Sequence, residues 1–137
     1  NIPELGPLVL LKGLLGEAIP VAVEASNFVE DGDTILSDFE VIATPGHTAG
    51  HVSYYYHPQK ALFAGDALAV IDGSVHFMAR PVTLDKETAR ESVIRCLKRE
   101  IELLCPGHRE FLTKDTQEKC QRLADYAATS KPWPLFG

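Results

Sequence analysis

The sequence lacks the features of several large classes of protein. No apolar run approaches the roughly 20 residues that a membrane-spanning helix needs, and the first residues do not show the pattern of a secretory signal. The net charge is −6, whereas nucleic acids and anionic membranes bind to basic surfaces. The composition therefore predicts no nucleic-acid partner and no membrane partner.

Cysteine is also scarce. Cys96, Cys105 and Cys120 are widely spaced and form no C-x-x-C pair, so the sequence indicates neither a zinc knuckle nor a thioredoxin motif. We interpret all three as small buried side chains of a cytoplasmic protein, because the cytoplasm keeps thiols reduced. The alternative is that Cys105, three residues before His108, acts as a nucleophile, but nothing near it in the sequence would clearly lower its pKa.

The 137 residues, 45% of them apolar, predict a single domain over 1–137. Residues 1–27 are expected to form a connector and a short helix, 28–112 a sheet with the functional motifs, and 113–137 a C-terminal helix and tail. Because the first residue is asparagine rather than methionine, we expect the chain to be trimmed or part of a longer protein.

The order of the expected elements predicts a mixed α/β fold. Runs rich in β-formers predict strands at 39–43, 52–56, 61–64, 75–78 and 101–105. Apolar residues at helical spacing predict helices over about 85–99 and 114–129, with Asp85 capping the first and Thr113 or Asp115 capping the second. Several strands followed by helix, strand and helix favour one sheet with helices packed against it.

Three metal-competent side chains follow apolar strands in tight turns. His47 comes after Pro45-Gly46, Asp66 after Gly65, and His108 after Pro106-Gly107. Two imidazoles and a carboxylate suit Zn²⁺, and also iron or manganese. Each residue has a simpler interpretation, since a turn histidine is more often structural and an aspartate after a strand is usually a turn or cap residue. The combination carries the metal hypothesis.

The runs 44-TPGHTAGH-51, 63-FAGDAL-68 and 105-CPGH-108, in this order, resemble the later motifs of the metallo-β-lactamase superfamily. The resemblance implies that His47 completes one metal site, that Asp66 bridges two metals and that His108 completes the second site. It also implies that His51 hydrogen-bonds within its turn and supports a ligand, and Thr48 is assigned the same supporting role. His57 and His76 match no motif and are expected at the surface or in turns.

The sequence departs from this family at its first motif. The H-x-H-x-D-H run that supplies the other ligands is absent, and the first 46 residues contain no histidine. The resemblance covers roughly residues 29–112. It implies half of an αββα four-layer sandwich, with one mixed sheet, helices on one face and an incomplete metal site. The run after Gly65 resembles uncharacterised hydrolases of the superfamily more than it resembles true β-lactamases. Its resemblance to glyoxalase II is more distant.

Three hypotheses about function follow. The first is that the chain is the C-terminal portion of a zinc-dependent hydrolase. The complete enzyme would cleave a small ester, thioester or lactone-type substrate with metal-bound hydroxide. This chain alone is expected to be inactive. The second is a non-catalytic truncated module with a vestigial metal site. The third is a single metal held by His47, Asp66 and His108 with water or a partner's side chain. The open sheet face predicts association, either as a homodimer or with the missing N-terminal half.

Overall fold

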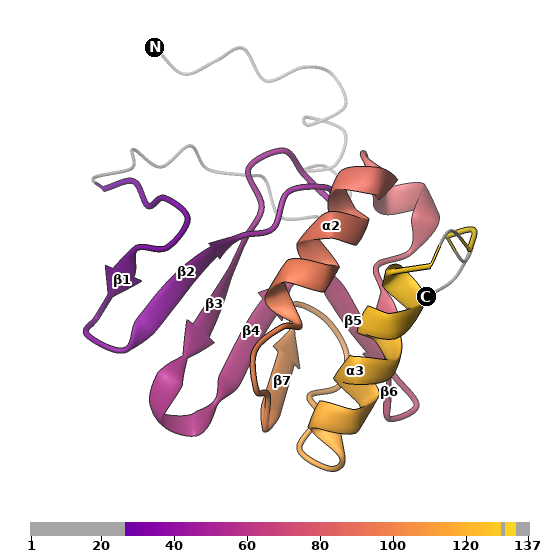
Figure 1. Cartoon of the computed structure of the whole chain (residues 1–137). Coiled ribbons are helices and arrows are strands. Elements are labelled where there is room, and N and C mark those ends of the chain that lie inside the picture. The colour runs from indigo at the N-terminus through magenta and orange to yellow at the C-terminus, as the bar shows by residue number, and fades with distance from the viewer. Residues whose placement is uncertain (1–26, 130, 134–137) are drawn as a thin grey trace, which may run out of the picture.

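A five-stranded mixed sheet forms the centre of the molecule (Figure 1). The computed structural model describes residues 27–129 and 131–133, so the connector and helix predicted for the first residues lie outside the described part. The strand order is β1-β2-β3-β4-β7, and only the β4–β7 pair is parallel. These strands are β1 (Thr34–Ile35), β2 (Phe39–Ala43), β3 (Val52–Tyr56), β4 (Ala61–Gly65) and β7 (Leu103–Pro106).

A separate hairpin follows the central strands. β5 (Leu68–Ile71) and β6 (Ser74–Phe77) form a two-stranded antiparallel sheet. The turn between them is Asp72-Gly73, and both residues have positive φ angles of 48° and 68°, as a tight hairpin turn requires. The mixed sheet expected from the sequence is thus confirmed, and this hairpin stands beside it as a second small sheet.

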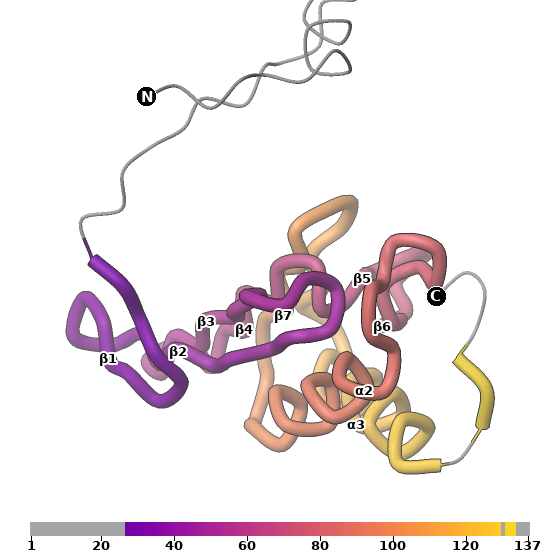
Figure 2. The backbone as a smooth tube through the Cα atoms, turned by 90° about the horizontal axis from the view of Figure 1, so that it is seen from above, coloured from indigo at the N-terminus to yellow at the C-terminus, as the bar shows by residue number. Residues whose placement is uncertain are grey.

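Two helices cover one face of the main sheet, as Figure 2 shows from above. Helix α2 (Lys86–Cys96) begins after Asp85, whose carboxylate accepts a hydrogen bond from the Thr88 amide, so the predicted cap is confirmed. The helix ends before the predicted position near residue 99, because the chain turns back to bury Ile101 in the core. Helix α3 (Thr116–Ala127) follows Asp115, which occupies the cap position without a side-chain capping bond. Short 3₁₀ turns cover His57–Gln59 and Arg80–Val82.

The main core lies between the helices and this face of the sheet. The helical residues predicted to face inward, Ala89, Val93, Cys96 and Leu97 of the first helical segment, are all at most 8% exposed. They belong to the same buried cluster as Leu62 and Leu104 of the sheet. Tyr55 points to this side too, and its hydroxyl donates to the Glu100 carbonyl over 2.6 Å.

The opposite face of the sheet is also apolar. The strand register aligns Val41, Tyr54, Phe63 and Cys105 across four neighbouring strands, and alternation along each strand directs them away from the helix side. Phe63 is 38% exposed, and Phe39 packs against Tyr56 with ring centroids 4.7 Å apart. No helix of the described residues covers this face, which agrees with half of a sandwich.

The carboxyl ends of three strands meet at one edge of the sheet. β2, β4 and β7 run in the same direction, because β2 and β4 are each antiparallel to β3 and β7 is parallel to β4. The register shifts between Phe63 and Gly65 where β4 ends, and such bulges redirect the residues that follow. The three motif turns therefore begin side by side, although they are far apart in the sequence.

None of the helices in the described part of the chain is long and apolar enough to cross a membrane.

Candidate metal centre

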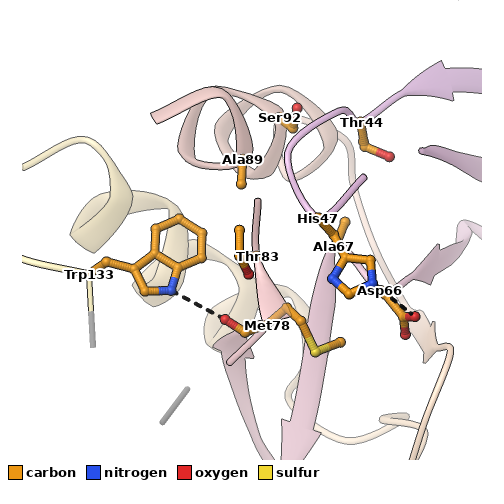
Figure 3. A pocket seen from close by; sticks show the side chains of 9 residues that line it. All are labelled: Thr44, His47, Asp66, Ala67, Met78, Thr83, Ala89, Ser92 and Trp133. Atoms are coloured by element: carbon orange, nitrogen blue, oxygen red, sulfur yellow. Dashed lines mark hydrogen bonds and ion pairs between the residues drawn. The ribbon is translucent and has the colours of Figure 1, made fainter. Parts of the chain in front are cut away.

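Asp66 lies between the two histidines that the motifs predicted. The His47 Nε2 atom is 3.5 Å from Asp66 Oδ2, and the His108 Nε2 atom is 3.3 Å from Asp66 Oδ1. Figure 3 shows the His47 ring directed at the Asp66 carboxylate. His108 is the most open of the three, with 73% of its side chain exposed, against 21% for His47 and 27% for Asp66. The fold thus brings all three predicted residues together.

The turn that carries His47 is fixed against helix α2. The Gly46 carbonyl accepts from the Asp85 amide over 2.9 Å, and the Pro45 carbonyl accepts from the Ser92 hydroxyl over 2.7 Å. A Cβ atom on Gly46 would lie 2.3 Å from the Cβ of Ala89, so only glycine lets this turn approach the helix so closely. The direction of His47 is therefore set by backbone packing.

The Asp66 turn is fixed against the turn that carries His108. The Gly107 amide donates to the Gly65 carbonyl over 2.8 Å. A Cβ atom on Gly107 would lie 2.6 Å from Asp66 Oδ1 and 3.2 Å from the Gly65 carbonyl carbon. The absence of a side chain at Gly107 therefore leaves the space that the Asp66 carboxylate occupies.

His51 connects the His47 turn with the Asp66 turn. Its Nδ1 atom is 2.8 Å from the Thr44 hydroxyl, and its Nε2 atom accepts from the Asp66 amide over 2.9 Å. Burial lowers the pKa of the His51 imidazole below its ordinary value, and the nearby His47 lowers it further. The neutral ring suits a nitrogen that must accept a hydrogen bond from an amide.

Thr48 contributes to the same turn through its backbone. Its carbonyl accepts from the Gly46 amide over 3.0 Å and from the His51 amide over 3.4 Å, while the residue itself is exposed. The supporting side chains are instead Thr44, which is 1% exposed, and its hydrogen-bond partner Ser53, which is fully buried. The roles predicted for His51 and Thr48 toward a metal remain predictions.

The donor atoms fit part of a metal centre. The buried Nδ1 of His47 and Oδ1 of Asp66 have no hydrogen-bond partner within the described residues. Atoms bound to one tetrahedral zinc at about 2.0–2.1 Å lie roughly 3.3–3.4 Å apart, close to the two separations measured at Asp66. Each histidine approaches a different Asp66 oxygen, however, and within the described residues no group of three His, Cys, Asp or Glu side chains could by itself hold a metal ion. The residues therefore fit two partial positions that share Asp66.

The remaining histidines and the cysteines lie in other settings. His57 pairs with Glu40 across 3.2 Å, and His76 lies within strand β6. Burial raises the pKa of the Cys105 thiol, which does not favour the nucleophile hypothesis, because a thiolate is the reactive form. Cys96 and Cys120 are buried, and burial raises the pKa of each to about 12. These two are inert core residues, as predicted, whereas the same prediction for Cys105 is wrong, because that residue is only partly buried.

A narrow pocket adjoins His47 and Asp66 (Figure 3). Trp133 closes one side of it, and its indole Nε1 donates to the Met78 carbonyl over 3.2 Å. The pocket has no room for a water-sized molecule. The residues that line it therefore pack against the His47 turn and leave no space for a ligand.

Comparison with known proteins identifies the family. The model of the metallo-β-lactamase superfamily matches residues 5–108. The chain belongs to this superfamily. The turns that carry His47, Asp66 and His108 all lie within the matched range, so the resemblance inferred from the motifs is confirmed.

Individual relatives agree with this assignment but are longer than the chain. The probable metallo-hydrolase YflN of Bacillus subtilis (strain 168) is 32% identical over 103 residues, which are 66% of this chain and 39% of YflN. The hydroxyacylglutathione hydrolase of Brucella anthropi is 48% identical over 59 residues, 41% of this chain and 23% of that enzyme. The solved structure of TTHA1623 in a di-iron-bound form matches with a TM-score of 0.58 at 30% identity, covering 78% of this chain and 55% of that one. The chain thus spans well under two thirds of each.

Sequence reasoning missed three supporting side chains. Thr44, Ser53 and Ser92 are buried hydroxyl residues that bond to the turns of the site. Thr44 is the first letter of the best motif, yet its bond to His51 spans the turn and becomes visible only in three dimensions. Ser53 and Ser92 lie in a strand and a helix, where a serine gives no distinctive signal.

The close contact at Gly107 gives a first prediction. Gly107→Ala should displace the Asp66 carboxylate and lower the free energy of unfolding by about 1–3 kcal/mol, because the added methyl overfills the turn. The displacement should appear as shifts of the Asp66 amide and the His108 ring resonances in NMR spectra, with stability measured by urea titration.

Gly50→Ala provides the matched control, because a Cβ atom at Gly50 would meet nothing within 4 Å. This substitution should change the free energy of unfolding by no more than about 0.5 kcal/mol. Equal effects of the two substitutions would contradict the packing role of Gly107.

Proposed function

We propose that this chain is the C-terminal portion of a metal-dependent hydrolase, and that His47, Asp66 and His108 supply part of its metal centre. The observation that carries the proposal is the position of Asp66, whose two carboxylate oxygens each approach a different imidazole nitrogen. An aspartate in this position can serve two metal positions at once. The buried Oδ1 atom of Asp66, which makes no hydrogen bond within the described residues, supports the same interpretation.

Zinc, iron or manganese would suit these donors. When bound, such a metal polarises the bond to be cleaved and lowers the pKa of water toward neutrality. The residues of this chain would then have defined tasks. Asp66 would balance positive charge between the two positions, the half-buried His47 would hold its position firmly, and the exposed His108 would face the solvent and the approaching substrate.

The substrate class follows from the relatives and is part of the proposal. Segments of 47 to 59 residues are 48–55% identical to several hydroxyacylglutathione hydrolases, and this favours an ester, thioester or lactone-type bond for the complete protein. The three donors of the described residues leave each metal position short of the three protein ligands that a catalytic zinc normally has. The chain alone is therefore proposed to be inactive.

Loss of the shared carboxylate gives the second prediction. Asp66→Asn keeps the shape of the side chain but removes its charge, so it should weaken zinc binding by at least about tenfold. Loss of a residue that only supports a metal ligand commonly weakens metal affinity by that much. Zinc bound per chain would be measured by equilibrium dialysis and plasma mass spectrometry. Asp125→Asn is the control, because Asp125 lies on the exposed side of α3 and pairs with Gln121. Equal zinc uptake by both variants and the unchanged chain would overturn the proposal.

The helix-free face of the main sheet is proposed as the surface through which the chain associates. It carries Tyr54 and Phe63 in register on adjacent strands, with Phe63 38% exposed, and monomers rarely leave large apolar side chains grouped in water. The partner is either a second copy or the missing N-terminal half. The same contact would bring the missing ligands to the edge where Asp66 lies.

Self-association gives the third prediction. Sedimentation equilibrium of the 137-residue chain should show a dimer, and Phe63→Lys should shift it to the monomer, because a charge at the centre of the face must be desolvated. Leu36→Lys is the matched control, since Leu36 is 82% exposed in the turn between β1 and β2. A chain that stays monomeric at all concentrations would rule out the homodimer.

A further inference from the structure

A continuous line of hydrogen bonds runs beneath the candidate metal centre. It starts at the Ala64 carbonyl, passes through the hydroxyls of Ser53 and Thr44, and reaches the ring of His51. The other ring nitrogen of His51 accepts from the Asp66 amide. The two ends of the line thus bond to the residues before and after Gly65, which has a left-handed φ of 53°.

The direction of every bond in this line is determined by chemistry. The Ala64 carbonyl can only accept, so the Ser53 hydroxyl donates to it over 3.1 Å. Ser53 must then accept from the Thr44 hydroxyl over 2.9 Å, because each hydroxyl has a single proton to give. Thr44 in turn must accept from Nδ1–H of His51 over 2.8 Å.

The Asp66 amide imposes the same arrangement from the other end. An amide N–H can only donate, so the Nε2 atom of His51, 2.9 Å away, must carry a lone pair. Both ends therefore require the same neutral tautomer of His51, with its proton on Nδ1. Ser53 is fully buried and Thr44 is 1% exposed, so water cannot readily replace either hydroxyl.

We propose that Thr44 and Ser53 are positioning residues, which fix the tautomer of His51 and thereby hold the Asp66 turn in register with the His47 turn. Thr44 lies three residues before His47 on the same turn, whereas Ser53 extends from the neighbouring strand β3. Without this line, the Asp66 peptide would be held from one side only, by the Gly107 amide on the Gly65 carbonyl. The two hydroxyls thus act on the site through His51 and touch neither metal nor substrate.

The hydrogen-bond line stands on the geometry alone, and its value to metal binding rests on the proposed function. The test therefore has two separate readouts on the same 137-residue chain. The first uses no metal: long-range proton–nitrogen NMR spectra report which ring nitrogen of His51 carries the proton, and hydrogen exchange reports the protection of the Asp66 amide. The second is the zinc affinity measured by equilibrium dialysis.

The chain offers a matched pair of substitutions. Thr44→Val breaks the line and keeps the side-chain shape. Thr116→Val also removes a buried threonine hydroxyl, one that donates to the Leu112 carbonyl at the start of α3, away from the site. Ser53→Ala is the second variant, and it decides the question if Thr44→Val does not fold.

We expect the unchanged chain to show His51 protonated on Nδ1 alone. Thr44→Val and Ser53→Ala should each introduce the other tautomer and speed exchange of the Asp66 amide by about tenfold or more, whereas Thr116→Val should alter neither. Zinc affinity should fall about 10- to 100-fold in the first two variants only.

Two results would overturn the inference. One is an unchanged chain with the His51 proton on Nε2, and the other is an Asp66 amide that exchanges equally in Thr44→Val and Thr116→Val. An unchanged chain that shows the expected tautomer but binds no zinc would leave the hydrogen-bond line standing, and would count against the proposed metal centre instead.

Discussion

The shared edge of three strands is the constraint on which the rest of the structure depends. β2, β4 and β7 end together, and each end leads into a turn that contains glycine and one potential ligand. Gly107 lets the His108 turn approach the Asp66 turn, because a side chain there would meet the Asp66 carboxylate, and Gly46 lets the His47 turn approach Ala89 of helix α2. Sheet topology brings His47, Asp66 and His108 together, and close backbone packing then sets their directions.

Hydrogen bonds from buried side chains complete this arrangement. Ser92 of α2 holds the His47 turn from the helix side, while His51 joins that turn to Asp66. Each of these side chains bonds to a backbone atom in a turn, so the side chains of His47 and Asp66 project from a rigid base. Such a base is what metal ligands need, because affinity depends on supporting contacts almost as much as on the ligands themselves.

Much of this could be predicted from the sequence, for physical reasons. Strand-ending Pro-Gly and Gly-Asp pairs mark turns wherever they occur, and a histidine or aspartate after them is visible without coordinates. The helix register could be predicted as well, since Val93 and Cys96 recur at helical spacing and face the core. The line of hydrogen bonds through Thr44 and Ser53 could not be predicted, because the partner of a buried hydroxyl is known only once the strands are paired. The end of α2 was also missed, because tertiary burial of Ile101 decides where the chain leaves the helix.

The sheet has apolar residues on both faces, and the described helices cover one of them. This agrees with a chain that spans 39% of YflN and 55% of TTHA1623. Under the proposed function, one absent layer would explain both the sheet face without a helix and the shortage of metal ligands. In the proposed complete molecule, one contact would bury the face and complete the centre together.

A zinc titration followed through the histidine side-chain nitrogens by NMR would test whether a metal binds at Asp66. We expect the rings of His47 and His108 to shift together with one apparent affinity, because both approach the same carboxylate. The ring of His57, which pairs with Glu40 elsewhere, should stay unchanged. Rings of His47 and His108 that do not respond, or that respond no more than His57, would contradict a metal centre at Asp66.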